Sequence, residues 1–448
     1  MSGSPTQSPG PDDRHAGDVT STEVSATVEP AVRTRDRAID VARIAALVVV
    51  MFGHCALLLA TIDDRGVRIG NLLGALPDLA PITWVVQVMP LFFLAGGAAG
   101  AYGWHPGKAW GTWLLTRTQR LCRPVFWYLA FWVAALLVAR LVLGPDSADA
   151  LGREAVALLW FLGVYLVVLS FVPLLTHMRS WRTMAAILAG LLAAVAVIDA
   201  IRFAVGNLEA GLANFLTVWL IPVVIGVGYA RQLVGARPAL AVAAAAFTAQ
   251  VMLAVFGPYE VALVVTGVEH TSNVTPPTLL LAMQCTWMSF LFVAAAAGIN
   301  RWAARPRVWR AVAVGNGGAM TLYLWHIPAI AIATFSLNAL GLDAFDVHAP
   351  GFWGRLALRA AVFAVVMAVL FRVLSPLEHR PLPWWDAPAA ATGARSVAAG
   401  VLVCAAGVAV LLLAKNGLAG VAGWTSLGAF VAATAAARLA GSSRATTV

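Results

Sequence analysis

A histidine lies inside an apolar stretch near the start of this chain, and two charged residues precede it on the same helical face. Arg43 comes eleven residues before His54, and Asp40 comes fourteen before it. At about 100° per residue, these steps return to within roughly 20° and 40° of the starting direction. Residues 39–61 are apolar enough to span a bilayer, so we expect His54 at membrane depth, about 16 Å beyond Arg43.

An ionisable group at membrane depth is costly to place and is a functional candidate by default. A neutral imidazole can act as a general base on a hydroxyl group. The alternative is a hydrogen bond between helices that has no chemical role. The alignment of Asp40 and Arg43 with His54 favours a functional site.

A second pattern is basic and opens the third apolar stretch. Arg120 and Arg123 are three residues apart, so they are neighbours on one helical face, and Arg117 extends the ridge. Guanidinium groups bind phosphate through paired hydrogen bonds. Arginines that anchor a loop on the cytoplasmic side give the same pattern, and the sequence leaves both interpretations open.

A second histidine, His326, lies about half-way through a later apolar stretch, at a depth similar to that of His54. Pro328 follows it and frees a backbone carbonyl, so His326 can also be a packing residue bonded to that backbone. Two histidines at matching depth favour a shared site.

Composition indicates a polytopic membrane protein. The 448 residues are 60% hydrophobic and 11% charged, whereas soluble domains carry about 25% charged residues. The fold class that follows is all-α, a transmembrane helix bundle. The net charge of +9 fits loops that face anionic lipid, so we expect a bilayer and not nucleic acid as partner. Cysteine and histidine spacings suggest no metal site.

Apolar stretches of spanning length occur twelve times after residue 36. They lie near residues 39–61, 82–102, 124–143, 155–175, 183–204, 212–230, 238–257, 277–299, 313–337, 354–376, 395–414 and 419–438. Residues 1–36 are polar, contain no signal peptide pattern, and are predicted to be a disordered cytoplasmic tail. The connecting segments are short, so any chemistry must take place among the helices or at their ends.

The loop charges support this count. With a cytoplasmic N-terminus, basic residues fall on the inner loops and acidic residues on the outer loops at nearly every crossing. An error of one helix would invert the pattern downstream. We therefore predict a multi-pass protein of the cell membrane with its N-terminus inside.

The chain resembles the integral-membrane acyltransferase 3 family over roughly residues 35–380. Arg43 and His54 resemble the family's opening motif, and the stretch from Arg120 to Pro124 resembles its arginine motif. The aromatic segments Trp160-Phe161-Leu162 and Tyr323-Leu-Trp-His326 resemble later motifs. One departure is Gly96-Gly97, where the family usually has Ser-Gly after two phenylalanines.

The resemblance implies ten core helices in residues 37–380. The two further helices expected in residues 381–448 come from the apolar stretches alone and lie outside the resemblance. The resemblance also implies an O-acyltransferase that uses acyl-CoA, in particular acetyl-CoA, as donor. Acceptors in the family are hydroxyl groups of cell-surface carbohydrates, glycolipids or secondary metabolites, so a saccharide or lipid-linked acceptor is expected.

By this resemblance, Arg120, Arg123 and Arg43 would hold the CoA phosphates, with Asp40 ordering Arg43. His54 would act as base or carry the acyl group, and His326 would bind acceptor or stabilise charge. Two other readings stay open. One is a proton-coupled transporter whose histidines relay protons, and the other is a non-catalytic subunit on the same scaffold.

Overall fold

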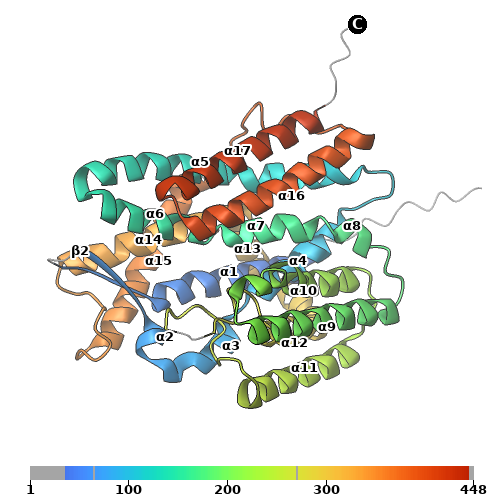
Figure 1. Cartoon of the computed structure of the whole chain (residues 1–448), viewed down its shortest axis with the longest axis horizontal. Coiled ribbons are helices and arrows are strands. Elements are labelled where there is room, and N and C mark those ends of the chain that lie inside the picture. The colour runs from blue at the N-terminus through green and yellow to red at the C-terminus, as the bar shows by residue number, and fades with distance from the viewer. Residues whose placement is uncertain (1–35, 64–65, 269–270, 443–448) are drawn as a thin grey trace, which may run out of the picture. The chain divides into compact units, whose positions relative to one another are not determined.

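The computed structural model describes residues 36–442, apart from residues 64–65 and 269–270 (Figure 1). The tail predicted to be disordered therefore lies outside the described residues, except for Asp36. The helices are α1 Arg37–Leu57, α2 Leu72–Ala75, α3 Thr83–Val86, α4 Met89–Tyr102, α5 Trp110–Leu143, α6 Pro145–Ala157, α7 Trp160–Leu169, α8 Val172–Leu175, α9 Trp181–Val205, α10 Asn214–Ala230, α11 Ala236–Phe256, α12 Leu279–Ala303, α13 Pro306–Gly317, α14 Ala319–Ala339, α15 Phe352–His379, α16 Gly393–Asn416 and α17 Gly420–Gly441.

Within the described residues, twelve helical segments are long and apolar enough to cross a membrane. This confirms the predicted polytopic helical bundle, and each segment overlaps one predicted stretch. Two of them begin with a turn of 3-10 helix, at Pro77–Ile82 and Leu208–Gly211. We call the ends at which α1 and α5 begin the basic side, because loop arginines gather there.

The first span is shorter than predicted and leads into a strand pair. α1 ends at Leu57, four residues before the predicted end. The chain continues as strand β1 Leu58–Asp63, which pairs with the antiparallel strand β2 Gly66–Asn71. Asn338 near the end of α14 donates a 2.8 Å hydrogen bond to Thr61 of β1. The hairpin thus extends α1 and is tied to α14.

The third span begins earlier than predicted. α5 starts at Trp110, so Arg117, Arg120 and Arg123 lie inside the helix and not in a loop before it. Pro124 therefore lies in the helix interior, where it lacks the N–H that would bond the carbonyl four residues back. The long arginine stems can follow the helix surface and place their charged ends at the membrane boundary. The basic ridge is a continuous helical surface.

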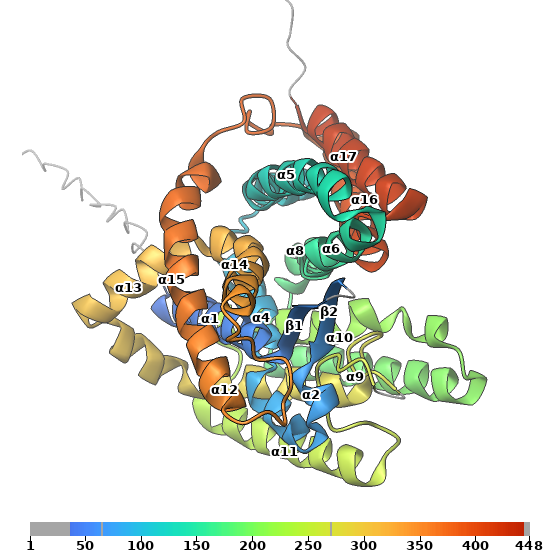
Figure 2. The ribbon, with the colours of Figure 1, turned by 90° about the vertical axis from the view of Figure 1, so that its left-hand side faces the viewer.

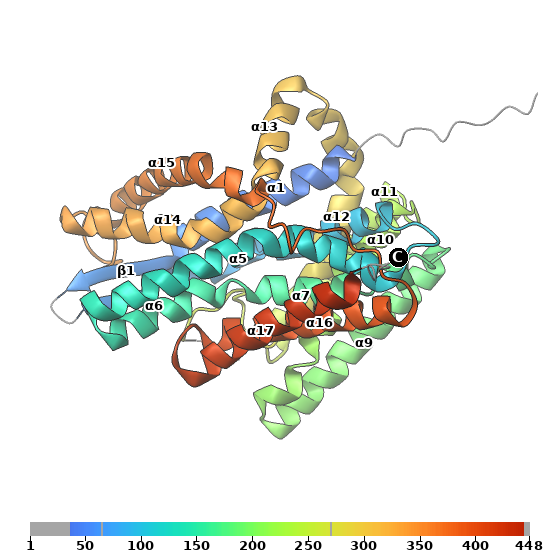
Figure 3. The same cartoon turned by 90° about the horizontal axis from the view of Figure 1, so that it is seen from above.

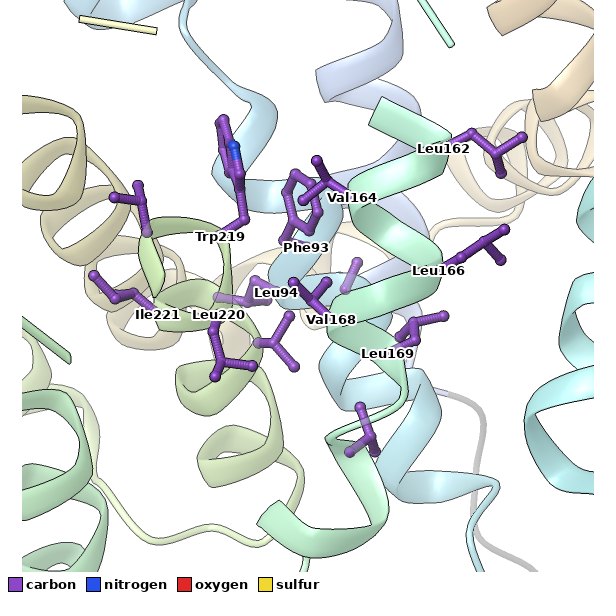
Figure 4. Packing of buried hydrophobic residues seen from close by; sticks show 14 of the residues in the cluster. Phe93, Leu94, Leu162, Val164, Leu166, Val168, Leu169, Trp219, Leu220 and Ile221 are labelled. Carbon is purple, nitrogen blue, oxygen red and sulfur yellow. The ribbon is translucent and has the colours of Figure 1, made fainter. Parts of the chain in front are cut away.

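The core of the bundle is built around α4, α7 and α10 (Figure 4). Phe93 of α4 stacks on Trp219 of α10 with ring centroids 4.7 Å apart, and both side chains are fully buried. A β-carbon on Gly226 would lie 2.1 Å from the carbonyl oxygen of Leu94. Because only glycine leaves room for this approach, the backbones of α4 and α10 lie in contact.

The last two spans pack on the bundle. α16 contacts α17, and it also contacts α5 and α6, as the end-on view shows (Figure 2). α16 contacts α7 as well. Gly163 of α7 and Gly407 of α16 face each other, and a β-carbon on either would lie within 3 Å of the other's carbonyl oxygen. This glycine pair lets the backbones of α7 and α16 approach closely.

Candidate functional site

The two membrane histidines are in direct contact. Nδ1 of His54 on α1 lies 2.9 Å from Nε2 of His326 on α14. The rings are nearly parallel, with an interplanar angle of 13° and centroids 5.2 Å apart. His326 is fully buried, whereas His54 is partly exposed. The structure thus brings together two residues that are 272 positions apart in the chain.

The hydrogen bonds define which ring nitrogens carry protons when both rings are neutral. Nδ1 of His326 lies 2.7 Å from the carbonyl oxygen of Tyr323, which can only accept, so His326 donates there. Nε2 of His326 is then an acceptor, and Nδ1 of His54 donates to it. This leaves Nε2 of His54 with a lone pair. A histidine oriented in this way can accept a proton from a hydroxyl group.

Asp40 and Arg43 lie on α1 near its beginning, several turns from His54. Asp40 is buried, and its carbonyl oxygen accepts a 2.9 Å hydrogen bond from Asn316, the residue before the last of α13. Arg43 is partly exposed. The shared helix puts Arg43 about 16 Å from His54 along the axis, so neither charged residue touches the histidine pair.

Arg120 and Arg123 differ in their surroundings. Arg120 is exposed, but Arg123 forms a 2.6 Å ion pair with Asp386, and the two side chains are only 19% and 13% exposed. Asp386 also accepts a 2.7 Å hydrogen bond from the backbone of Leu382. Arg123 therefore fixes the segment that follows α15. The sequence did not suggest Asp386 as a partner of Arg123.

Arg117 is the arginine of the ridge that points toward the core. Its guanidinium lies over the ring of Trp113, 3.9 Å from the ring centroid, and rests against Gly103 at the end of α4. It also interacts electrostatically with Tyr165 of α7. Arg117 thus lies at the basic end of α4, on the side of Tyr165 of α7.

A series of aromatic rings leads from Tyr165 to the histidine pair. The ring of Tyr165 lies 5.3 Å from that of Phe161, which lies 5.7 Å from that of Tyr323. The ring of Tyr323 in turn lies 6.5 Å from that of His326. Three helices contribute to this series, α1 and α14 meeting at the histidines and α7 at the other end. It connects the basic side with His54.

Tyr165 also explains why position 96 is a glycine in this chain. A β-carbon on Gly96 would lie 2.6 Å from the Tyr165 hydroxyl oxygen, which is too close for any side chain. The space that a serine would need at position 96 is taken by the phenol ring of α7. A hydroxyl group is therefore present at this place, supplied by Tyr165.

Arg359 of α15 lies beside the site, although the sequence motifs did not single it out. It is 1% exposed, and its Nη2 donates a 2.6 Å hydrogen bond to the carbonyl oxygen of Cys55, the residue after His54. Its Nε and Nη1 have no hydrogen-bond partner among the described residues. Its position within the predicted span 354–376 is a signal that the sequence does offer, because an ionisable residue inside a membrane span is a functional candidate.

A second buried polar cluster has a structural role. Asp199 of α9 accepts hydrogen bonds from Asn214, from Tyr259 and from the backbone of Leu279 at distances of 2.7–3.0 Å. Burial and the neighbouring Asp199 carboxylate raise the pKa of Tyr259, so its phenol stays protonated and donates. Because these contacts join α9, α10, the start of α12 and the loop before it, the cluster fixes that loop. Among the described residues, no group of three His, Cys, Asp or Glu side chains is placed to hold a metal ion.

Comparison with known families gives one match. A family model described as an acyltransferase domain, of the acyltransferase 3 type, matches residues 36–374. No curated protein and no solved structure gives a match. The matched range includes both histidines, the arginine ridge and the aromatic series, and it covers most of the chain. The chain therefore belongs to the acyltransferase 3 family of membrane proteins.

Proposed function

We propose that this membrane acyltransferase moves an acyl group, in particular acetyl, from acyl-CoA on the basic side to a hydroxyl group of a carbohydrate, glycolipid or secondary metabolite. The observation that carries the proposal is the hydrogen-bond series from Tyr323 through His326 to His54. It leaves Nε2 of His54 unprotonated, as a general base requires.

In the proposed reaction, His54 first accepts a proton and later returns it. Nε2 of His54 takes the proton from the acceptor hydroxyl while the hydroxyl oxygen attacks the thioester carbonyl carbon. The C–O bond forms, the C–S bond breaks, and the CoA sulfur receives the proton back from His54. His326 then acts by holding the ring of His54, since both of its own nitrogens are engaged. A transient acyl-histidine on His54 is the alternative route.

The basic ridge is the proposed site for the CoA phosphates. Arg120 is exposed, and Arg117 lies at the basic end of α4, so both are placed to meet a ligand from the basic side. Arg43 is near the same side, and Asp40 would order the start of α1. Arg123 would bind a CoA phosphate once that phosphate displaces the carboxylate of Asp386. The pantetheine arm would follow the aromatic series toward His54.

The test is CoA release from acetyl-CoA by the full-length protein in nanodiscs, with a cell-envelope extract as the source of acceptor. His54→Ala should abolish release, while His348→Ala, which removes an exposed histidine, should leave it unchanged. Both variants should be expressed and inserted in the membrane, and His348→Ala should melt like the wild type. Release of CoA that persists in His54→Ala would show that His54 is not the general base.

The same preparation addresses the transporter reading. Substrate flux into vesicles without any acyl-CoA, together with no thiol release from any acyl-CoA, would favour transport by a relay of the two histidines. Burst kinetics with acyl-CoA alone, in the absence of acceptor, would favour the acyl-histidine route over direct transfer.

A further inference from the structure

A groove of about 690 Å³ lies between α1, α13, α14 and α15, and none of the residues that line it has a role in the proposed reaction. Two views show α13 beside α1 and α15 (Figures 2 and 3). The walls are apolar. Val48 and Phe52 come from α1, and Phe363 and Met367 come from α15. The ring of Phe52 meets the ring of Phe363 edge-on, with centroids 5.3 Å apart.

One end of the groove is cationic. Arg307 and Arg310 line it from α13, and Ala311 and Val314 follow on the same helical face at spacings of three and four residues. Both arginines are exposed, and neither forms an ion pair with a residue in the described part of the chain. The groove therefore offers an apolar wall along two membrane helices and two guanidinium groups at the basic side.

This combination matches an amphiphile with an anionic head. We propose that the groove binds one anionic phospholipid, with its phosphate at Arg307 and Arg310 and an acyl chain along Phe52 and Met367. Guanidinium groups bind phosphate oxygens in forked pairs, and apolar walls match a hydrocarbon chain. The volume is in the range of about 300–1,000 Å³ typical of small-molecule sites.

The bilayer is the source that the geometry favours. Val48, Phe52 and Val314 are 42%, 40% and 59% exposed on helices that cross or adjoin the membrane, so the groove is open where lipid lies. Acyl-CoA is a poorer match, because its head carries a nucleotide and three phosphate groups, whereas the groove offers only the guanidinium groups of Arg307 and Arg310 among its lining residues. A lipid would reach the groove by lateral diffusion in the bilayer, and its phosphate would lie at the level of α13.

The groove also reaches the helix turns that carry the histidines. Met51 lines it three residues before His54, and Leu322 lines it four residues before His326. On a helix, these spacings place each lining residue on the same face as its histidine, one turn away. A bound lipid would thus contact α1 and α14 one turn before the histidine on each helix. The binding proposal itself does not depend on the proposed reaction.

The test is native mass spectrometry of the full-length protein with phosphatidylglycerol and with phosphatidylcholine of the same acyl chains. We expect the wild type to retain phosphatidylglycerol preferentially. Arg307→Gln combined with Arg310→Gln should weaken this binding roughly thirty-fold, since each arginine near a membrane surface contributes about a five-fold factor. Ala364→Trp, which fills the groove from an exposed position on α15, should also abolish retention.

Matched controls separate the groove from general effects of charge and bulk. Arg301→Gln with Arg305→Gln removes two positive charges from exposed positions just before α13, and Val365→Trp places an indole at an exposed position outside the groove. Both should bind like the wild type. Equal retention of the two lipids, equal loss in the controls, or displacement of phosphatidylglycerol by palmitoyl-CoA in an Arg310-dependent way would each overturn the proposal.

Discussion

The hydrogen bond between the two histidines predicts a specific pattern of activity losses. In His326→Leu, Nδ1 of His54 loses its acceptor, because leucine has no polar atom and position 326, which Nδ1 faces, is fully buried. A buried donor left unpaired costs about 1–3 kcal/mol. If that cost falls on the transition state, kcat should decrease about 5–150-fold. His54→Ala removes the base itself and should lower kcat about 10²–10⁴-fold.

The double variant provides the sharper measurement. If His326 acts only by holding His54, then His54→Ala with His326→Leu should be no slower than His54→Ala alone, because residues that act as one unit are not additive. His326→Gln should recover part of the activity, since an amide oxygen can accept the proton of His54. The assay is CoA thiol release in nanodiscs, with kcat and KM determined separately and melting curves as the check on folding.

Three results would contradict this reasoning. The losses of the two single variants multiplying in the double variant would mean that His326 acts independently on a substrate. An effect of His326→Leu confined to KM would indicate acceptor binding and not orientation of the base. A His326→Leu variant slower than His54→Ala would reverse the assigned roles of the two histidines.

Three further predictions concern packing and the arginine ridge. Gly226→Ala should destabilise the protein by about 1–3 kcal/mol and lower its melting temperature, because the new β-carbon would overlap the backbone of α4 at 2.1 Å, whereas Gly190→Ala points into open space and should not. Arg123→Gln should cost about 1–3 kcal/mol of stability, since Asp386 loses its 2.6 Å partner. Arg120→Gln should leave the melting temperature unchanged and raise KM for acetyl-CoA roughly five-fold. An unchanged melting temperature in Gly226→Ala or Arg123→Gln, or an unchanged KM in Arg120→Gln, would contradict the corresponding assignment.

The spans were predictable because a bilayer imposes a strong and simple constraint on composition. Every helix that crosses it needs about 20 apolar residues, and the charged residues must gather between such stretches. The sequence therefore predicted all twelve spans. The end of α1 and the start of α5 were predicted less well, because apolar residues also form the β1–β2 hairpin and arginines also form helices.

The contacts of the site depend on which helices become neighbours, and hydropathy does not carry that information. Depth alone made His54 and His326 comparable, but their 2.9 Å contact results from the packing of α1 against α14. The same limit applies to Arg123. Its spacing from Arg120 suggested a shared role, whereas the fold places Asp386 beside Arg123 only.

Arg359 was missed because the predicted end of the first span was four residues too late. Had α1 continued to Thr61 as predicted, the N–H of Leu59 would have bonded the carbonyl of Cys55 within the helix. Because α1 ends at Leu57, that buried carbonyl has no donor four residues on in the helix and needs one from elsewhere. Arg359 supplies it at 2.6 Å, with a positive charge that suits a helix C-terminus. The need for a buried arginine on α15 thus follows from where α1 ends, at Leu57, three residues after the proposed base.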